Sequence, residues 1–161
     1  MAPTLNNGEF VIILNQGVLN AYYNLIKNDN SNYTYRDGDV VVFGMPTVFE
    51  KGIVKFTKMI KRVEKNFNNQ LFSNKYWLVP QKGDSVSVNE NNYEELKTLI
   101  LYDRYNMVSK KFSEIKENQT YRFDNNFYFL IGDNVESSMD SREYGPIPEA
   151  FIYGKILYSF N

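Results

Sequence analysis

Residues 127–155, FYFLIGDNVESSMDSREYGPIPEAFIYGK, decide the fold that we predict for this chain. The apolar run 127–131 predicts a buried strand, and the Gly-Asp-Asn sequence at 132–134 ends it with residues that favour turns. Hydroxyls, a carboxylate and a guanidinium follow at 137–142, and the apolar run 151–160 closes the chain. These polar groups would be costly to bury without partners. On composition alone, a surface loop with a weak Asp140–Arg142 ion pair is the favoured interpretation.

The composition restricts the chemistry that this chain can perform. Its 161 residues suit one domain with a real core, and the 16% of aromatic residues favours β structure. The formal net charge of −1 makes nucleic acid an unexpected partner. The chain has 0 Cys and 0 His, which excludes disulfides, a thiol nucleophile, imidazole catalysis and zinc sites built from these residues. A hydrolase of this composition must use a carboxylate, a lysine or a terminal amine as its base.

The order of residues in the C-terminal stretch points to a family. The pattern GDNxxSSxDSRxxGxxP, followed by Ile-x-Gly-Lys at 152–155, resembles the C-terminal motif of bacterial type I signal peptidases. These are membrane-anchored serine endopeptidases that use a Ser-Lys dyad and no cofactor or metal. The resemblance implies that Ser138 orients the catalytic lysine. It also implies that two ion pairs support the active site, namely Asp140 with Arg142 and Asp133 with Arg62.

The first residues of the chain resemble a second motif of the same family. The sequence Met-Ala-Pro-Thr-Leu at 1–5 precedes Gly8-Glu9 and the apolar run Phe10–Leu14, which predicts a strand. In the family, the nucleophilic serine stands immediately before this methionine. The serine is therefore expected just before Met1 and is absent from this chain, so we expect the chain as printed to be inactive.

The basic segment Lys55–Val63 contains the lysine candidates. Taken alone, so many Lys and Arg residues are typical of a solvated face. The segment also resembles the family's lysine motif, which makes Lys61 the catalytic base and Lys58 the reserve candidate. A lysine can serve as a base only when its amine is neutral, and burial can lower a lysine pKa by as much as ~3–5 units. The apolar neighbours Met59 and Ile60 suit that requirement.

Another apolar run, Val40–Phe43, follows the turn sequence Asp37-Gly38 and predicts a core strand. In the family, the corresponding strand lines a groove that holds the signal peptide as an added strand. Each matching position fits a plain core role equally well. The matching positions are Met1, Leu5, Met59 and Ile60 for the first substrate pocket and Val11, Val42 and Ile60 for the third.

We therefore predict a mostly β protein with a signal-peptidase-type barrel or sandwich core in a single catalytic domain spanning 1–161. A small accessory α/β insertion is expected at about 64–126, with a strand at 85–88 and a helix at 94–104. A helix or an irregular loop is expected at 18–26. The expected partners are the signal peptides of secreted preproteins.

The resemblance also places the protein. We expect it at the bacterial cytoplasmic membrane, with the catalytic domain on the extracytoplasmic face and an N-terminal anchor that this chain lacks. Two alternatives stay open. One is a non-catalytic paralogue that binds export substrates or partners, and the weaker one is a self-cleaving repressor-type peptidase.

Overall fold

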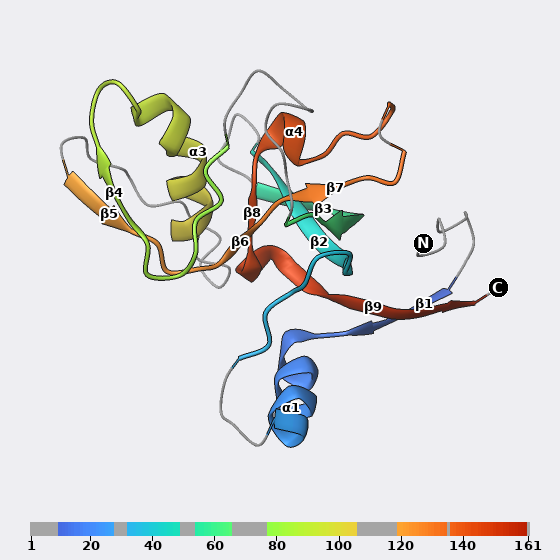
Figure 1. Cartoon of the computed structure of the whole chain (residues 1–161). Coiled ribbons are helices and arrows are strands. Elements are labelled where there is room, and N and C mark those ends of the chain that lie inside the picture. Colours follow the sequence, from blue (N-terminus) through green and yellow to red (C-terminus); the bar gives the residue numbers. More distant parts are fainter. Residues whose placement is uncertain are drawn as a thin grey trace. The chain divides into compact units, whose positions relative to one another are not determined.

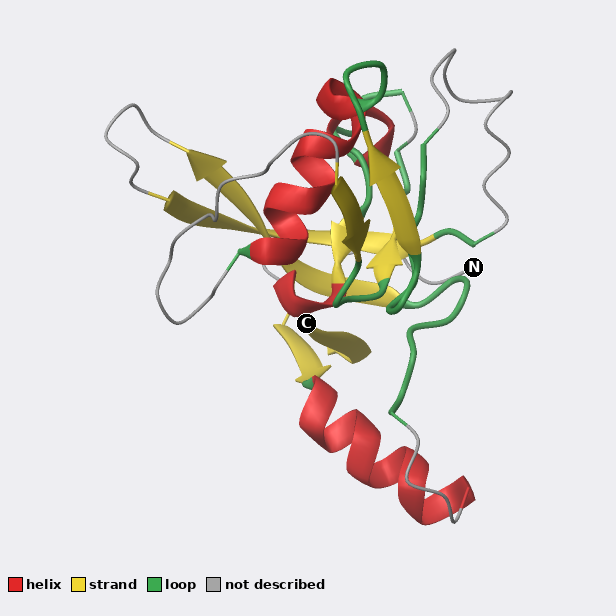
Figure 2. Ribbon diagram, turned by 90° about the vertical axis from the view of Figure 1, so that its left-hand side faces the viewer, coloured by secondary structure: helices red, strands yellow, loops and turns green. Residues whose placement is uncertain are grey.

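A computed structural model describes residues 10–27, 32–48, 54–65, 77–105, 119–134 and 136–160. The chain divides into two compact units, which we call the first and the second unit. The first unit comprises Met1–Asn66, Ile131–Ser138 and Ile152–Asn161, and the second comprises Phe67–Leu130 and Met139–Phe151. Strands make up most of the described elements (Figure 2), so the predicted mostly β class is confirmed. A single catalytic domain over the whole chain stays a prediction.

The first unit contains most of a five-stranded sheet. The strands follow the order β1 (Phe10–Leu14), β9 (Ile152–Phe160), β2 (Val40–Val48), β3 (Val54–Val63) and β7 (Leu130–Ile131). Figure 1 shows β1 and β9 side by side although they come from opposite ends of the chain. The strand predicted at Phe10–Leu14 is confirmed, and most of the C-terminal apolar run forms β9. The central strands β2 and β3 pair without a shift of register from Val40↔Arg62 to Val48↔Val54.

Local sequence explains why β2 begins where it does. Gly38 has a φ of 81°, a conformation that favours glycine, and this allows the tight Asp37-Gly38 turn. The Gly38 amide then donates to Val63 O at 2.8 Å, and the Val63 amide donates to Asp39 O at 2.8 Å. These two bonds align the beginning of β2 with the end of β3. The predicted strand at Val40–Phe43 is therefore confirmed.

Between β1 and β2 lies the helix α1 (Gln16–Lys27), which extends the helix considered for 18–26. Its first turn is capped by Asn15, whose Oδ1 accepts a hydrogen bond from the Val18 amide at 3.0 Å. Leu19 is its buried side chain, which anchors the helix to the first unit. No helix in the part of the chain that the structure describes is long and apolar enough to span a membrane.

The second unit has its own core around the helix α3 (Tyr93–Arg104). An antiparallel two-stranded sheet pairs β4 (Ser85–Val88) with β5 (Gln119–Arg122), so the strand and the helix predicted here are both confirmed. A second short ladder pairs β6 (Phe127–Tyr128) with β8 (Ile147–Pro148). The helix α4 (Ser141–Tyr144) and the 3-10 turn η1 (Glu149–Phe151) complete this unit. One cluster of buried core side chains consists of Val88, Leu96, Leu99, Ile100, Tyr121, Phe123 and Phe127.

The strand predicted at 127–131 is broken at Phe129, and this is a correction to the sequence analysis. The first half, β6, pairs with β8 in the second unit, whereas β7 belongs to the five-stranded sheet. One apolar run therefore forms two short strands, and each of them pairs with a different strand. Its composition cannot reveal the break, because both halves and Phe129 between them are apolar.

A buried carboxylate organises the turn before β6. Asp103 is 6% exposed and accepts hydrogen bonds from Tyr121 OH at 2.6 Å, Asp124 N at 2.9 Å and Asn125 N at 3.0 Å. A buried acceptor of this kind is satisfied by several donors, as its burial requires. The network connects the end of α3 to the turn that leads into residues 127–155.

Replacing Tyr121 with phenylalanine should flatten the loss of stability at high pH. Burial, together with the hydrogen bond to Asp103, raises the pKa of Tyr121 in the folded chain. The stability that depends on its proton is complete below the unfolded-state value of about 10 and is lost as the pH rises through the higher folded-state value. Urea unfolding between about pH 8 and about pH 11 measures this slope. Equal slopes for Tyr121→Phe and the parent chain would contradict the assignment.

Candidate active site

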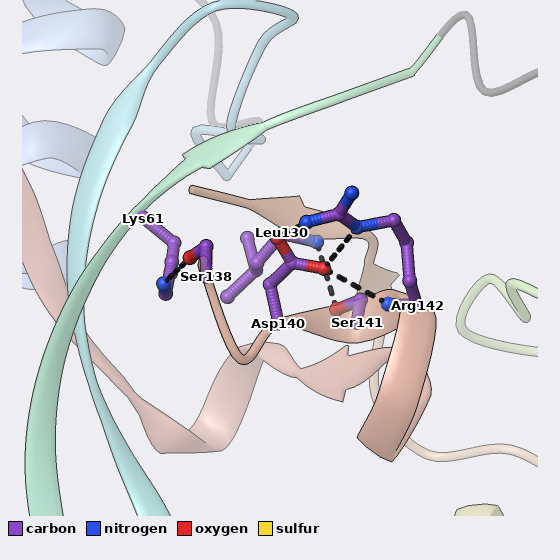
Figure 3. A network of polar contacts seen from close by, with 6 residues as sticks. All are labelled: Lys61, Leu130, Ser138, Asp140, Ser141 and Arg142. Atoms are coloured by element: carbon purple, nitrogen blue, oxygen red, sulfur yellow. Dashed lines mark hydrogen bonds and ion pairs between the residues drawn. The ribbon is translucent and has the colours of Figure 1, made fainter. Parts of the chain in front are cut away.

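Lys61 and Ser138 meet in the first unit. Lys61 lies on β3, and Ser138 lies in the segment that follows β7. The Lys61 ammonium Nζ donates a hydrogen bond to Ser138 Oγ, and Figure 3 shows the two side chains pointing toward each other. Both residues are half-buried. The two residues, 77 positions apart in the sequence, thus form one polar contact beside the sheet.

The strand register explains the direction of the lysine. Lys61 lies opposite Val41 of β2, and the Val41 side chain is completely buried. Because paired residues of neighbouring strands share a face, Lys61 lies on the face of the sheet that carries Val41. Ile60, its neighbour, therefore lies on the other face and is 41% exposed. The alternation of side chains along β3 therefore places Lys61 beside the buried Val41. The many basic residues of this segment are typical of a solvated face and do not predict this position.

The reserve candidate Lys58 lies elsewhere. It pairs with Gly44 on the opposite face of β3 from Lys61, and its ammonium lies 5.7 Å from the centre of the Tyr153 ring. This distance is typical of a cation–π contact. The lysine beside Ser138 is therefore Lys61.

Gly132 provides the space in which the two side chains meet. A Cβ atom at Gly132 would overlap Ser138 Oγ and would lie 2.8 Å from Lys61 Nζ. Any larger residue would have to displace both groups. Sequence reasoning assigned Gly132 only to a turn. The position of Gly132 between a buried strand and the serine cluster is a sequence signal for a role at the site. Only the folded structure shows that Lys61 and Ser138 are its neighbours.

Replacing Gly132 with alanine should separate Lys61 from Ser138 and destabilise the chain. Overpacking of this kind typically costs about 1–3 kcal/mol of unfolding free energy. Gly17→Ala is the control, because a Cβ at this position in α1 meets only Asn15 Oδ1 at 3.4 Å. Alanine in a helix should be neutral or stabilise by up to ~1 kcal/mol. Urea unfolding of the two variants tests this, and a Gly132→Ala chain as stable as Gly17→Ala would contradict the role of Gly132.

An exposed ion pair holds the turn after β7 against β3. Arg62 donates from Nε to Asp133 Oδ1 at 3.0 Å and from Nη2 to Oδ2 at 3.1 Å. Its Nη1 also donates to Gly38 O at 3.1 Å. The residue that follows Lys61 therefore binds the turn that contains Gly132. This arrangement is the one expected from the family resemblance for Arg62 and Asp133.

A buried ion pair lies in the second unit. The Asp140 side chain is fully buried and accepts hydrogen bonds from Arg142 Nε and Nη2, both at 2.7 Å. Hydrogen bonding to Asp140 raises the pKa of Arg142. Asp140 also caps α4 through the Arg142 amide at 3.2 Å, and Ser141 Oγ accepts a hydrogen bond from the Leu130 amide at 2.9 Å (Figure 3). This pair is buried and is not the weak surface pair that composition alone favoured.

The predicted substrate positions divide between two faces of the sheet. Val42 and Ile60 are paired and share one face, whereas Met59 alternates with Ile60 and shares the face of Lys61. Val42 is buried, and Val11 and Met59 are half-buried. Met1 and Leu5 lie outside the described residues. The roles of all these positions in binding stay predictions.

A third ion pair was missed by sequence reasoning. Lys155 Nζ donates to Asp39 Oδ1 at 2.6 Å, across 116 positions of sequence. Lys155 belongs to the Ile-x-Gly-Lys pattern, but no local signal names its partner. Among the described residues, no group of three or more His, Cys, Asp or Glu side chains is placed to hold a metal ion.

Comparison with known proteins shows the same family that the motifs resemble. The family model described as "Signal peptidase, peptidase S26" matches residues 78–160, just over half of the chain. This match includes Ser138 and both residues of the Asp140–Arg142 pair. It begins at residue 78 and therefore does not include Lys61. A signal peptidase I from Buchnera aphidicola subsp. Baizongia pistaciae (strain Bp) is 26% identical over 206 residues. That alignment covers 98% of this chain, which spans 66% of the length of the relative.

Proposed function

This chain belongs to the signal peptidase family, peptidase S26, and on that basis we propose that it is the catalytic part of a serine endopeptidase that removes signal peptides from exported proteins. The observation that carries the proposal is the hydrogen bond from Lys61 to Ser138. A serine hydroxyl is a weak nucleophile and needs a base beside it. Since the sequence has no His and no Cys, lysine is the basic side chain that fits this role.

The nucleophile in this proposal is a serine immediately before Met1. It is inferred from the resemblance of residues 1–5 to the family's serine motif. Those residues lie outside the described ranges, so the proposal rests on their sequence. Ser138 is the second hydroxyl, which orients the Lys61 amine toward the nucleophile. Positioning of this kind matters because a catalytic group must be held close to its productive geometry.

The proposed reaction has two stages. The serine hydroxyl attacks the carbonyl carbon of the scissile peptide bond, and Lys61 Nζ takes the hydroxyl proton. The C–N bond then breaks, Lys61 returns the proton to the amine of the mature protein, and the signal peptide is left as an ester on the serine. Water, deprotonated by the same lysine, hydrolyses the ester and restores the serine.

The proposed substrate is an extended signal peptide with small residues at the first and third positions before the cut. Main-chain hydrogen bonds to a strand give affinity, and shallow pockets give selection. Met59 and Ile60 contribute to the first pocket, and Val11, Val42 and Ile60 to the third. The proposed location is the extracytoplasmic face of the bacterial cytoplasmic membrane, with an N-terminal anchor that precedes the serine.

The codons upstream of Met1 in the parent gene test this proposal. We expect a serine codon directly before Met1, preceded by an apolar segment of about 20 residues, enough to span a membrane. Another residue at that position would remove the nucleophile. It would favour a non-catalytic paralogue that keeps the fold and binds export substrates or partners without cutting them.

A further inference from the structure

Asp39 lies at the centre of a polar cluster outside the Lys61–Ser138 contact. The carboxylate is 8% exposed and accepts hydrogen bonds from Tyr33 OH at 2.7 Å, from the Arg36 amide at 2.9 Å and from Lys155 Nζ at 2.6 Å. All four residues belong to the first unit. Burial, together with the hydrogen bond to Asp39, raises the pKa of Tyr33, so its hydroxyl remains a donor. Three hydrogen-bond donors hold the Asp39 carboxylate in place, but the proposed reaction does not use this cluster.

The strand register relates this cluster to Lys61. Lys155 of β9 lies opposite Val41 of β2, and Val41 lies opposite Lys61 of β3. Paired residues share a face of the sheet, and Asp39 precedes Val41 by two residues and points the same way. Lys155, Asp39 and Lys61 therefore lie on one face. Two strand spacings of about 4.8 Å separate the backbones of the two lysines by about 10 Å.

We propose that the Asp39–Lys155 ion pair is a positioning element for Lys61, an assignment that rests on the proposed function. Asp39 compensates the positive charge of Lys155. The Lys155 ammonium can therefore lie on the same face of the sheet as Lys61, the proposed base, without repelling a proton from the Lys61 amine. The fully buried Val41 separates the two lysines, so water screens them less than it screens surface charges.

Among the described residues, the polar groups beside Lys61 on β3 and after β7 have partners. On the segment after β7, Asp133 binds Arg62, and Ser138 accepts the hydrogen bond from Lys61 itself. The charged groups that approach its face from the residue before β2 and from β9 are Asp39 and Lys155. Removing one member of this last pair leaves a net charge near Lys61, and the sign of that charge depends on which member is removed.

This sign can be measured on the chain of residues 1–161 without any substrate. Lysine labelled with ¹³C is incorporated, the Lys61 signal is assigned with Lys61→Arg, and its chemical shift is followed as the pH is raised. Asp39→Asn leaves the Lys155 ammonium uncompensated and should move the Lys61 midpoint to lower pH. Lys155→Met leaves the Asp39 carboxylate and should move it to higher pH. Each shift should be about 0.5 to 1 pH unit for unit charges about 10 Å apart.

The double variant separates the charge effect from a structural one. Asp39→Asn with Lys155→Met removes both charges and should return the Lys61 midpoint close to that of the parent chain. Lys97→Met is the control, because its partner Glu94 forms an exposed pair at 3.6 Å in the second unit. Shifts of the same sign in both single variants, or no shift in either, would overturn the assignment.

The test is independent of catalysis. Opposite shifts in a chain whose serine-bearing form is inactive would uphold the charge coupling and reject the proposed function. An active enzyme without these shifts would support the proposed function and reject the charge coupling. In an active enzyme, Asp39→Asn should also extend activity to lower pH, while Lys155→Met should restrict it to higher pH.

Discussion

Replacing Lys61 with alanine in an enzyme that carries the serine before Met1 should lower preprotein turnover by at least ~10²–10⁴-fold, the usual contribution of a general base. The alanine side chain cannot accept the serine proton, and no histidine is present to replace the amine. Initial rates with purified preprotein in detergent measure the effect. Lys58→Ala is the matched control, because Lys58 stacks over Tyr153 on the opposite face of β3.

Several companion results should accompany this loss. Ser138→Ala should reduce turnover less than Lys61→Ala, because it misorients the amine without removing it. The rate should rise with pH, because only a neutral amine can accept a proton, and metal chelators should have no effect. Near-normal turnover by Lys61→Ala would reject the Ser-Lys dyad. Lys58 or a carboxylate would then be the candidate base.

Replacing Asp140 with alanine should destabilise the chain by about 3–5 kcal/mol, the typical cost of removing one partner from a buried ion pair. The Arg142 side chain is 15% exposed, and the variant leaves its guanidinium without the carboxylate that binds it at 2.7 Å. The cap of α4 is lost at the same time. Urea unfolding gives the difference in free energy, and thermal unfolding serves if the variant is too unstable for an extrapolation.

The control for Asp140→Ala is Asp133→Ala. The side chains of Arg62 and Asp133 are 25% and 37% exposed, so this pair should contribute only ~0–1 kcal/mol. The two variants delete the same group from pairs that differ in burial. Equal losses of stability would contradict the claim that burial makes the Asp140–Arg142 pair the stronger determinant of stability.

Local patterns predicted those elements whose cause is local. The Val40–Phe43 run after Asp37-Gly38 predicted β2, because a tight turn and β-branched residues together define a strand. The spacing of the apolar residues Leu96, Leu99 and Ile100 in 94–104 likewise predicted α3. These features need no information from distant parts of the chain.

Features that depend on distant pairing could not be read from the sequence. The many basic residues of β3 are typical of a solvated face, yet its register with β2 places Lys61 beside the buried Val41. The partner of Lys155 is fixed by the pairing of β2 with β9, and the break at Phe129 by the different partners of β6 and β7. For the candidate site, the family motifs supplied the identities of Lys61 and Ser138, whereas the space left by Gly132 came from the fold.

Cleavage of a preprotein whose signal peptide ends in Ala-x-Ala shows whether a serine before Met1 acts as the nucleophile of this protein. Three proteins are compared: residues 1–161, the same chain extended by an apolar anchor and a serine before Met1, and that extended chain with alanine in place of the added serine. Mass spectrometry of the products locates the cut. We expect a cut directly after Ala-x-Ala by the serine-bearing chain and none by the other two. The same cut by residues 1–161, or by the alanine form, would contradict it.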